Sequence, residues 1–388
     1  MGTRTSFAGG GRLWLCLVLL GATICPAMAS SWRVTNGDWF EGINWTGGVP
    51  GRNSLADISN GGTAAIYSGA VHVWIISVGA GTVVLGETGT VEADTEAVGA
   101  LGAGTFTQTG GTHTVWTEMY MGRGTGGVGT YELSGSGSFL GYQLFLGDRG
   151  TGRFIQTGGT NTLSHLVRLG GDPTGVGIYE LSGAGSLSAA SVWVGNHGTG
   201  TFTQTGGTST VIGNIYLGFS SGGEGEYGIS GGSLAVGEVF VGSAGQGRFS
   251  ITGAGAQITV SQAFAFGEDS AFSAVAGSTI HMAGAGFTNQ NTDPADLTGL
   301  ANLTLIFEGG TDSDDFEVAG EDRGAALTGW DANFELYKLQ LGTGIPVQCG
   351  RIRLVDSYDN QSDGGTANEV LYADWLVMNA GASWCGPP

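Results

Sequence analysis

Two glutamates of this sequence recur in one phrase, and paired carboxylates are the groups that cleave glycosidic bonds. Glu132 and Glu180 each follow a tyrosine in the phrase YELSG. Glycoside hydrolysis needs two carboxyl groups about 5–9.5 Å apart, one acting as acid and the other as base or nucleophile. Because the repeated phrase by itself accounts for both glutamates, the pattern favours a structural repeat over a catalytic pair.

A row of aromatic residues with one arginine is the strongest candidate for ligand binding. Each member stands two residues before a glycine in the recurring pattern apolar-x-apolar-Gly. The row, called the aromatic stripe below, comprises Tyr120, Phe145, Arg168, Trp193, Tyr216 and Phe240. Both neighbours of each member are apolar, so alternation along a strand predicts that the stripe points outward. Aromatic faces suit sugar rings, and Arg168 could hold a carboxylate or sulfate. The alternative is a stacked ladder that only stabilises the fold.

The acidic segment 311–322 is a candidate cation site. Oxygen-rich clusters bind Ca²⁺, and the ligands of this hypothesis are Asp312, Asp314, Asp315 and Glu317. The spacing differs from that of an EF-hand loop, which requires glycine at position 6 and glutamate at position 12. A solvated acidic loop is therefore the alternative.

The remaining reactive residues form no recognisable catalytic motif. The histidines, at positions 72, 113, 165, 197 and 281, fall at different phases of the repeat described below, which argues against a metal cluster. Lys338 is the only lysine, and the sequence has neither a phosphate-binding loop with its lysine nor a Ser-His-Asp order. No catalytic residue is predicted.

A repeat positions all of these side chains. GTFTQTGGT at 104–112 recurs letter for letter at 200–208. Its aromatic position recurs as Phe106, Tyr131, Phe154, Tyr179, Phe202, Tyr227 and Phe249. The marker glycine recurs at 79, 99, 122, 147, 170, 195, 218, 242 and 267. These spacings predict nine structural units of about 24 residues each.

Short strands rich in Thr, Val, Tyr and Phe and broken by glycine predict an all-β parallel β-helix, or β-solenoid. Equivalent residues of successive coils then stack about 4.8 Å apart, which places Glu132 and Glu180 about 9.6 Å apart with Ile155 between them. Phe106 and its equivalents are predicted to fill the interior. Gln108, Gln156 and Gln204 fall on the same face, so their amides are expected to bond corner backbone groups or to reach water at a corner.

The ends of the repeat lead to a domain prediction. Residues 30–60, which contain Trp32, Trp39 and Trp45, are expected to cap the first coil. Residues 61–287 form the solenoid, and the repeat signature fades over 288–388, which is predicted as a small β-rich C-terminal domain. Cys349 and Cys385 could pair if the compartment is oxidising.

Several segments together resemble a known family. They are GDWFEGINWTGGVP (37–50), the TFTQTGG and TYELSG repeats, LTLIFEGG (303–310) and EVLYADWLVMNAGA (369–382). They are similar to secreted bacterial proteins of the autotransporter-like β-strand-repeat type, of the kind found in planctomycetes. The resemblance implies surface display, often through a PEP-CTERM sorting signal or a dockerin. Members continue with a further strand after the last segment, so this chain is expected to be truncated.

Residues 1–29 have the pattern of a secretory signal peptide. Arg4 and Arg12 precede an apolar run over 13–24, and Ala27-Met28-Ala29 offers a cleavage site. An uncleaved anchor is the alternative, and no other segment is apolar enough for membrane insertion. The net charge of −20 argues against nucleic acid and anionic lipid as partners.

The sequence as a whole favours a secreted or cell-surface scaffold without enzymatic activity. Its role is predicted to be structural or adhesive, with a polysaccharide or a cell-surface molecule as partner, bound by the aromatic stripe. The alternative is a polysaccharide-active β-helix enzyme, a lyase or a glycoside hydrolase. The oligomeric state is left open.

Overall fold

The structure is a computed structural model that describes residues 29–308, 314–324, 330, 333–343, 351–361, 369–379 and 383–385. Residues 1–28 of the predicted leader, the candidate ligand Asp312, and Cys349 lie outside this part of the chain. The leader and the cysteine pairing therefore stay predictions. Within the described residues, no helix has the length and apolar character of a membrane-spanning one.

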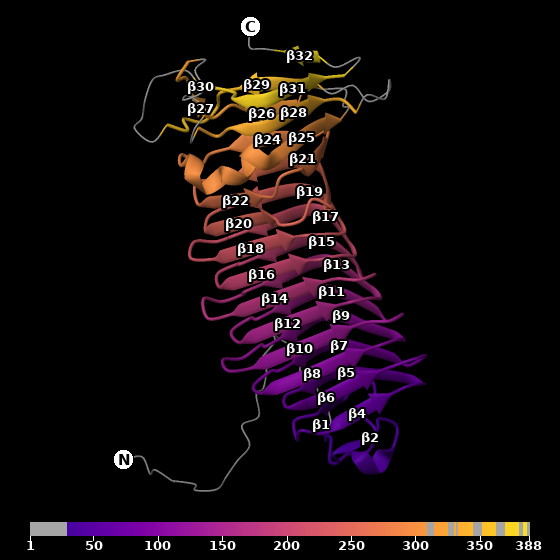
Figure 1. The fold of residues 1–388 in the computed structure, drawn as a ribbon. Coiled ribbons are helices and arrows are strands. Elements are labelled where there is room, and N and C mark those ends of the chain that lie inside the picture. Colours follow the sequence, from indigo (N-terminus) through magenta and orange to yellow (C-terminus); the bar gives the residue numbers. More distant parts are fainter. Residues whose placement is uncertain are drawn as a thin grey trace, which may run out of the picture.

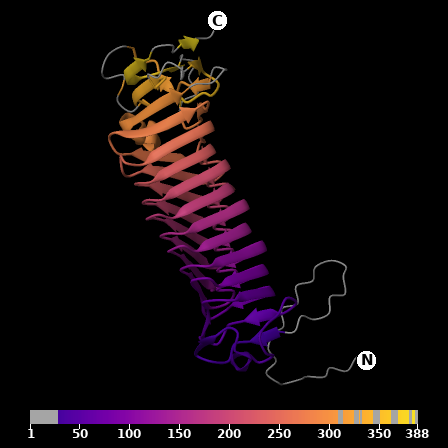
Figure 2. The same ribbon diagram turned by 90° about the vertical axis from the view of Figure 1, so that its right-hand side faces the viewer.

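The described chain is an elongated parallel β-solenoid, which confirms the predicted fold class. Figures 1 and 2 show its strands stacked along one long axis, with the earliest strands at one end and the latest at the other. Two parallel sheets form its sides. The prediction of nine coils was too low, because the solenoid has about 12 turns.

The 11-stranded sheet contains one short strand from each of its coils. Its members are β2 (Asn36–Asp38), β4 (Thr63–Ile66), β6 (Gly81–Leu85), β8 (Ala103–Gln108), β10 (Val128–Leu133), β12 (Thr151–Gln156), β14 (Val176–Leu181), β16 (Thr199–Gln204), β18 (Glu224–Ile229), β20 (Gln246–Ile251) and β22 (Ser270–Ala274).

The 19-stranded sheet contains the longer strands and continues to the C-terminal end. Its first members are β1 (Ala29–Ser31), β3 (Leu55–Asp57), β5 (Ala70–Val78), β7 (Thr90–Val98), β9 (Thr112–Met121), β11 (Ser138–Leu146), β13 (Thr160–Leu169), β15 (Ser186–Val194), β17 (Thr208–Leu217), β19 (Ser233–Val241) and β21 (Gln257–Phe266). The later members are β23 (Ser278–Ala283), β24 (Gly286–Asn289), β25 (Leu303–Glu308), β26 (Asp314–Glu317), β28 (Leu336–Leu341), β29 (Arg351–Val355), β31 (Ala373–Met378) and β32 (Ser383–Cys385).

Four small elements complete the description. β27 (Gly320–Glu321) and β30 (Glu369–Val370) form an antiparallel pair outside the two sheets. The short helix η1 (Gly42–Asn44) precedes β3, and η2 (Pro294–Asn302) lies next to β22 in Figure 1.

A ladder of rings fills the interior, as the repeat predicts. Tyr131 pairs in register with Phe106 on one side and Phe154 on the other. The rings from Phe106 through Phe249 are fully enclosed and stack nearly parallel, with centroids 4.6–5.5 Å apart. Each ring therefore packs against the coils above and below it.

The buried glutamines link neighbouring coils. Gln108 Nε2 donates to the backbone oxygens of Gly111 and Ser138, as expected of a corner contact. Its Oε1 accepts from the hydroxyl of Tyr131 at 2.5 Å. Gln156 with Tyr179 and Gln204 with Tyr227 repeat this arrangement. Burial raises the pKa of all three tyrosines, so each hydroxyl keeps the proton that it donates.

This network explains why coils with an interior Phe alternate with coils with an interior Tyr, so that the sequence repeats over two coils. A Phe coil carries the glutamine, and the next coil carries the tyrosine whose hydroxyl needs that glutamine. A buried hydroxyl without a partner would be destabilising, so Tyr and Gln have to alternate together.

The long strands of the 19-stranded sheet are interrupted by a β-bulge at a constant place. The register of β11 against β9 and β13 shifts between Gly141 and Gln143, and equivalent shifts recur in the pairs from β7–β9 to β19–β21. A bulge interrupts the ladder and bends the strand. Side chains at the bulge leave the buried row: Trp116, Tyr142 and Ile212 are all exposed.

Both ends of the chain take part in the same architecture. β1 pairs with β3 and β2 with β4, and Trp32 and Trp39 pack against Trp45 inside the first turn. At the other end, β25, β28 and β31 pair in parallel. The 19-stranded sheet therefore runs through both predicted boundaries, and a distinct cap and a distinct C-terminal domain stay predictions.

Candidate ligand-binding surfaces

The aromatic stripe is continuous in the structure. Tyr120 pairs with Phe145, Phe145 with Arg168, and the register continues through Trp193, Tyr216 and Phe240. The residues on either side of each member face the core, so the stripe lies on the outer face of the sheet, as alternation predicts.

The first half of the stripe is packed and its charge is compensated. The guanidinium of Arg168 lies 4.2 Å from the ring centroid of Phe145, which is only 6% exposed. Arg168 Nη2 also donates to Asp148 Oδ1 at 2.8 Å. Asp148 follows a corner glycine, a position that the sequence argument did not consider. An anionic ligand at Arg168 would therefore compete with Asp148.

The second half of the stripe is an aromatic platform. Tyr216 and Phe240 stack at 4.8 Å, and Trp193 stacks on Phe219 at 4.2 Å. Trp193, Tyr216, Phe219 and Phe240 are all partly exposed. Phe219 directly follows the corner glycine Gly218. Inspecting the residue after each corner glycine in the sequence would have identified Phe219.

A second aromatic row lies at the bulge and was missed by the sequence argument. Trp116 is 60% exposed and Tyr142 is 45% exposed, and they come from the adjacent strands β9 and β11. The ring of Tyr142 stacks on His165 from the next coil at 5.0 Å. These three residues are called the bulge ridge below. They do not occupy one equivalent position of the repeat, because the number of residues in the bulge differs from strand to strand.

A groove of about 440 Å³ crosses β16, β18, β20 and β22 on the other sheet. Four exposed acids line it, namely Glu224, Glu226, Asp269 and Asp296. Arg248 also lines it, with its Nε 3.9 Å from Glu226 Oε1. These acids do not recur in the repeat, so the sequence alone does not single them out.

The glutamates of the YELSG phrase face structural partners. Ile155 pairs with both Glu132 and Glu180, as the stacking argument predicts. Arg153 Nη2 donates to both oxygens of Glu180, at 2.7 and 2.8 Å. This partner pairing supports a structural role for the phrase.

One histidine forms a Glu-His-Tyr arrangement inside the solenoid. His113 Nε2 lies 2.8 Å from Glu96 Oε2, and its Nδ1 lies 2.9 Å from the Tyr131 hydroxyl. These are the groups of a proton relay, but all three side chains are completely enclosed. A substrate has no access to them, so the arrangement is part of the core.

In the acidic segment 311–322, the side chains of Asp315 and Glu317 contact two different groups of residues. Asp315 accepts two hydrogen bonds from Arg353, at 2.7 and 2.8 Å. Glu317 turns instead toward Asp356 and Glu369, and Asp314 is not part of that group. Burial raises the pKa of Glu317, and burial together with nearby acids raises the pKa of Glu369 to about 7.

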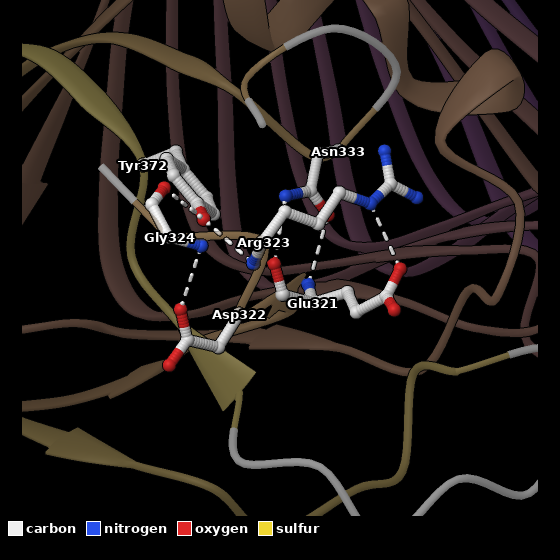
Figure 3. A network of polar contacts seen from close by, with 6 residues as sticks. All are labelled: Glu321, Asp322, Arg323, Gly324, Asn333 and Tyr372. Carbon is white, nitrogen blue, oxygen red and sulfur yellow. Dashed lines mark hydrogen bonds and ion pairs between the residues drawn. The ribbon is translucent and has the colours of Figure 1, made fainter. Parts of the chain in front are cut away.

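A polar network fixes the segment that follows Glu317 (Figure 3). The Tyr372 hydroxyl accepts from the backbone N–H of Arg323 and donates to the backbone oxygen of Gly324. Asn333 bonds both backbone groups of Glu321, at 2.8 and 2.9 Å. The network therefore holds β27 and, through their pairing, β30 with Glu369.

Comparison of the chain with known protein families, curated proteins and solved structures finds no match.

Proposed function

We propose that this protein is a secreted or surface-displayed β-solenoid scaffold that binds glycans on its aromatic stripe. The observation that carries the proposal is the in-register platform of the partly exposed rings of Trp193, Tyr216 and Phe240. Rings at the spacing of stacked coils match the repeat of an extended sugar chain lying along the rod. Aromatic rings bury the CH-rich face of a pyranose effectively.

The charge of the protein narrows the ligand class. The chain carries a net charge of −20, and Asp148 already pairs with the only cation of the stripe. A densely anionic polysaccharide would be repelled by this field. Neutral or sparsely charged glycans are therefore the proposed ligands.

The test is a glycan array probed with the wild type and with Trp193→Ala/Tyr216→Ala. The double variant is expected to lose binding and keep its circular dichroism spectrum, because the removed rings lie outside the core. Trp116→Ala/Tyr142→Ala removes two rings from the bulge ridge and is the matched control, with binding expected to remain.

The result can also contradict the stripe. Loss of binding only in the ridge variant would move the site to the ridge. Equal binding by all three proteins, or binding by none, would leave the stripe as a structural ladder.

The groove on the other sheet favours a second candidate function, glycoside hydrolysis. Glu224 and Glu226 lie two positions apart on β18, so both project from one face. If the groove is catalytic, a panel of polysaccharides should release reducing ends with the wild type. Glu226→Gln should reduce the rate at least about a hundredfold, whereas Glu132→Gln, outside the groove, should not. No release by the wild type would reject this candidate.

A further inference from the structure

Three carboxylates from distant parts of the sequence meet near the C-terminal end of the rod. Glu317 ends β26, Asp356 follows β29, and Glu369 begins β30. One oxygen from each lies within 4.8 Å of the other two. Like charges this close repel one another, and the burial of Glu317 strengthens the repulsion, so the arrangement needs compensation.

Two side-chain oxygens, one on Glu369 and one on Asn360, have no hydrogen-bond donor. Glu369 Oε2 is closed off from solvent and has no partner. Asn360, whose side chain is only 3% exposed, likewise leaves its Oδ1 without one. Buried polar atoms are almost always satisfied. One unsatisfied oxygen belongs to the cluster and the other to the residue whose N–H bonds Glu369, so together they point to a missing ligand. Carboxylate and amide oxygens are the ligands that hard cations prefer.

One loop both supplies a carboxylate and orients the other two. The backbone N–H groups of Ser357 and Tyr358 donate to Glu317 Oε1, at 2.6 and 2.9 Å. The N–H of Asn360 donates to Glu369 Oε1 at 2.6 Å. One oxygen of Glu317 and one of Glu369 are thus held by the backbone, and Glu369 Oε2 is left for a ligand. Hydrogen bonds of this kind orient the ligands of metal sites.

The separation of the oxygens can be compared with the geometry of common cations. Ca²⁺ binds oxygen at about 2.3–2.6 Å, so two ligands on opposite sides of it lie about 4.6–5.2 Å apart. Mg²⁺ binds at about 2.0–2.1 Å, which limits that separation to about 4.2 Å. The three oxygens lie within 4.8 Å of one another, a spread that Ca²⁺ can accommodate. We propose that Glu317, Asp356 and Glu369 bind one Ca²⁺ ion.

The ion would join three strands that are far apart in the sequence. β26 and β29 are neighbours in the 19-stranded sheet, whereas β30 belongs to the outer pair with β27. A bound cation ties this outer pair to the sheet and neutralises the charge between them. Its expected effect is to stabilise the last turns of the solenoid, independently of glycan binding.

The test uses the chain without its predicted leader, stripped of metal by a chelator. Calorimetric titration with CaCl₂ should show one ion bound, a higher melting temperature, and a weaker response to MgCl₂. Asp356 is exposed, so Asp356→Asn should fold and bind Ca²⁺ about tenfold or more weakly. Asp374→Asn makes the same charge change at an exposed site outside the cluster and should bind as the wild type does.

Glu369→Gln separates a cation site from a purely structural carboxylate. In chelator this variant should melt no lower than the wild type, because it removes a charge from the cluster. It should also no longer respond to Ca²⁺. The proposal is overturned if the wild type shows neither heat nor a melting shift at millimolar Ca²⁺. A response that Asp356→Asn and Glu369→Gln both retain, or one that Mg²⁺ matches, overturns it equally.

Discussion

Replacing Phe154 with alanine is expected to destabilise the protein by about 3–5 kcal/mol, the range typical of large aromatic truncations. The ring of Phe154 is fully enclosed and stacks between Tyr131 at 4.8 Å and Tyr179 at 5.0 Å. Its removal leaves a cavity bordered by three coils. The coils above and below are held by their backbone pairing and cannot move in to fill this cavity. The measurement is the urea dependence of unfolding, followed by circular dichroism.

Hydrogen exchange locates the damage. Each coil of a solenoid contacts only its neighbours, so protection should fall in β10, β12 and β14 more than at the ends of the rod. Ile212→Ala is the control, since this side chain is 71% exposed at the bulge and its loss should change stability by less than about 0.5 kcal/mol. Equal midpoints for Phe154→Ala and the wild type would contradict the stacking of the core.

The repeated middle of the solenoid was predictable from single residues. The recurrence of an aromatic residue at Phe106, Tyr131 and Phe154 identified the pairing register, because stacked coils must present the same cross-section to one another. The same register placed the aromatic stripe correctly on the outer face. In a solenoid, a residue contacts the residue at the same position of the next repeat. The repeat in the sequence therefore predicts which residues are in contact.

Contacts that break the period were not predictable. The last turns have longer connections, so no repeat in the sequence predicts the parallel pairing of β25 with β28 and of β28 with β31. These turns were therefore not counted, and the number of turns was underestimated. The meeting of Glu317 with Asp356 and Glu369 depends on those same connections. The bulge ridge was missed for a related reason, because the inserted residues differ between coils.

The Tyr-Gln network lies between these extremes. The sequence showed that Phe coils and Tyr coils alternate and that Gln108 faces inward. It did not show that the Tyr131 hydroxyl is what Gln108 binds, because the bond joins two coils through their interior. Treating every buried polar group as needing a partner would have led to it, since the glutamine oxygen needs a donor and the tyrosine hydroxyl needs an acceptor.

Replacing Gly147 with alanine is expected to destabilise the protein by about 3 kcal/mol or more, from two separate causes. Gly147 has φ +65°, a left-handed conformation that costs an L-residue about 1–2 kcal/mol. An added Cβ would also lie 2.0 Å from the backbone oxygen of Val176 in the next coil, and relieving such a clash typically costs about 1–3 kcal/mol more. The corner and its neighbour both have to move.

Two further glycines separate these causes, with the urea midpoint as the common measurement. Gly126 has φ +79° with nothing within 4 Å of an added Cβ, so Gly126→Ala should show only the conformational cost. Gly152 has no such φ, but its Cβ would lie 2.3 Å from the backbone nitrogen of Gly147, so Gly152→Ala should show only the clash. If stacked corners set the cross-section of the solenoid, Gly147→Ala should be the most damaging of the three. A ranking with Gly126→Ala as damaging as Gly147→Ala would show that the coils are not in contact at their corners, and that backbone conformation alone selects glycine there.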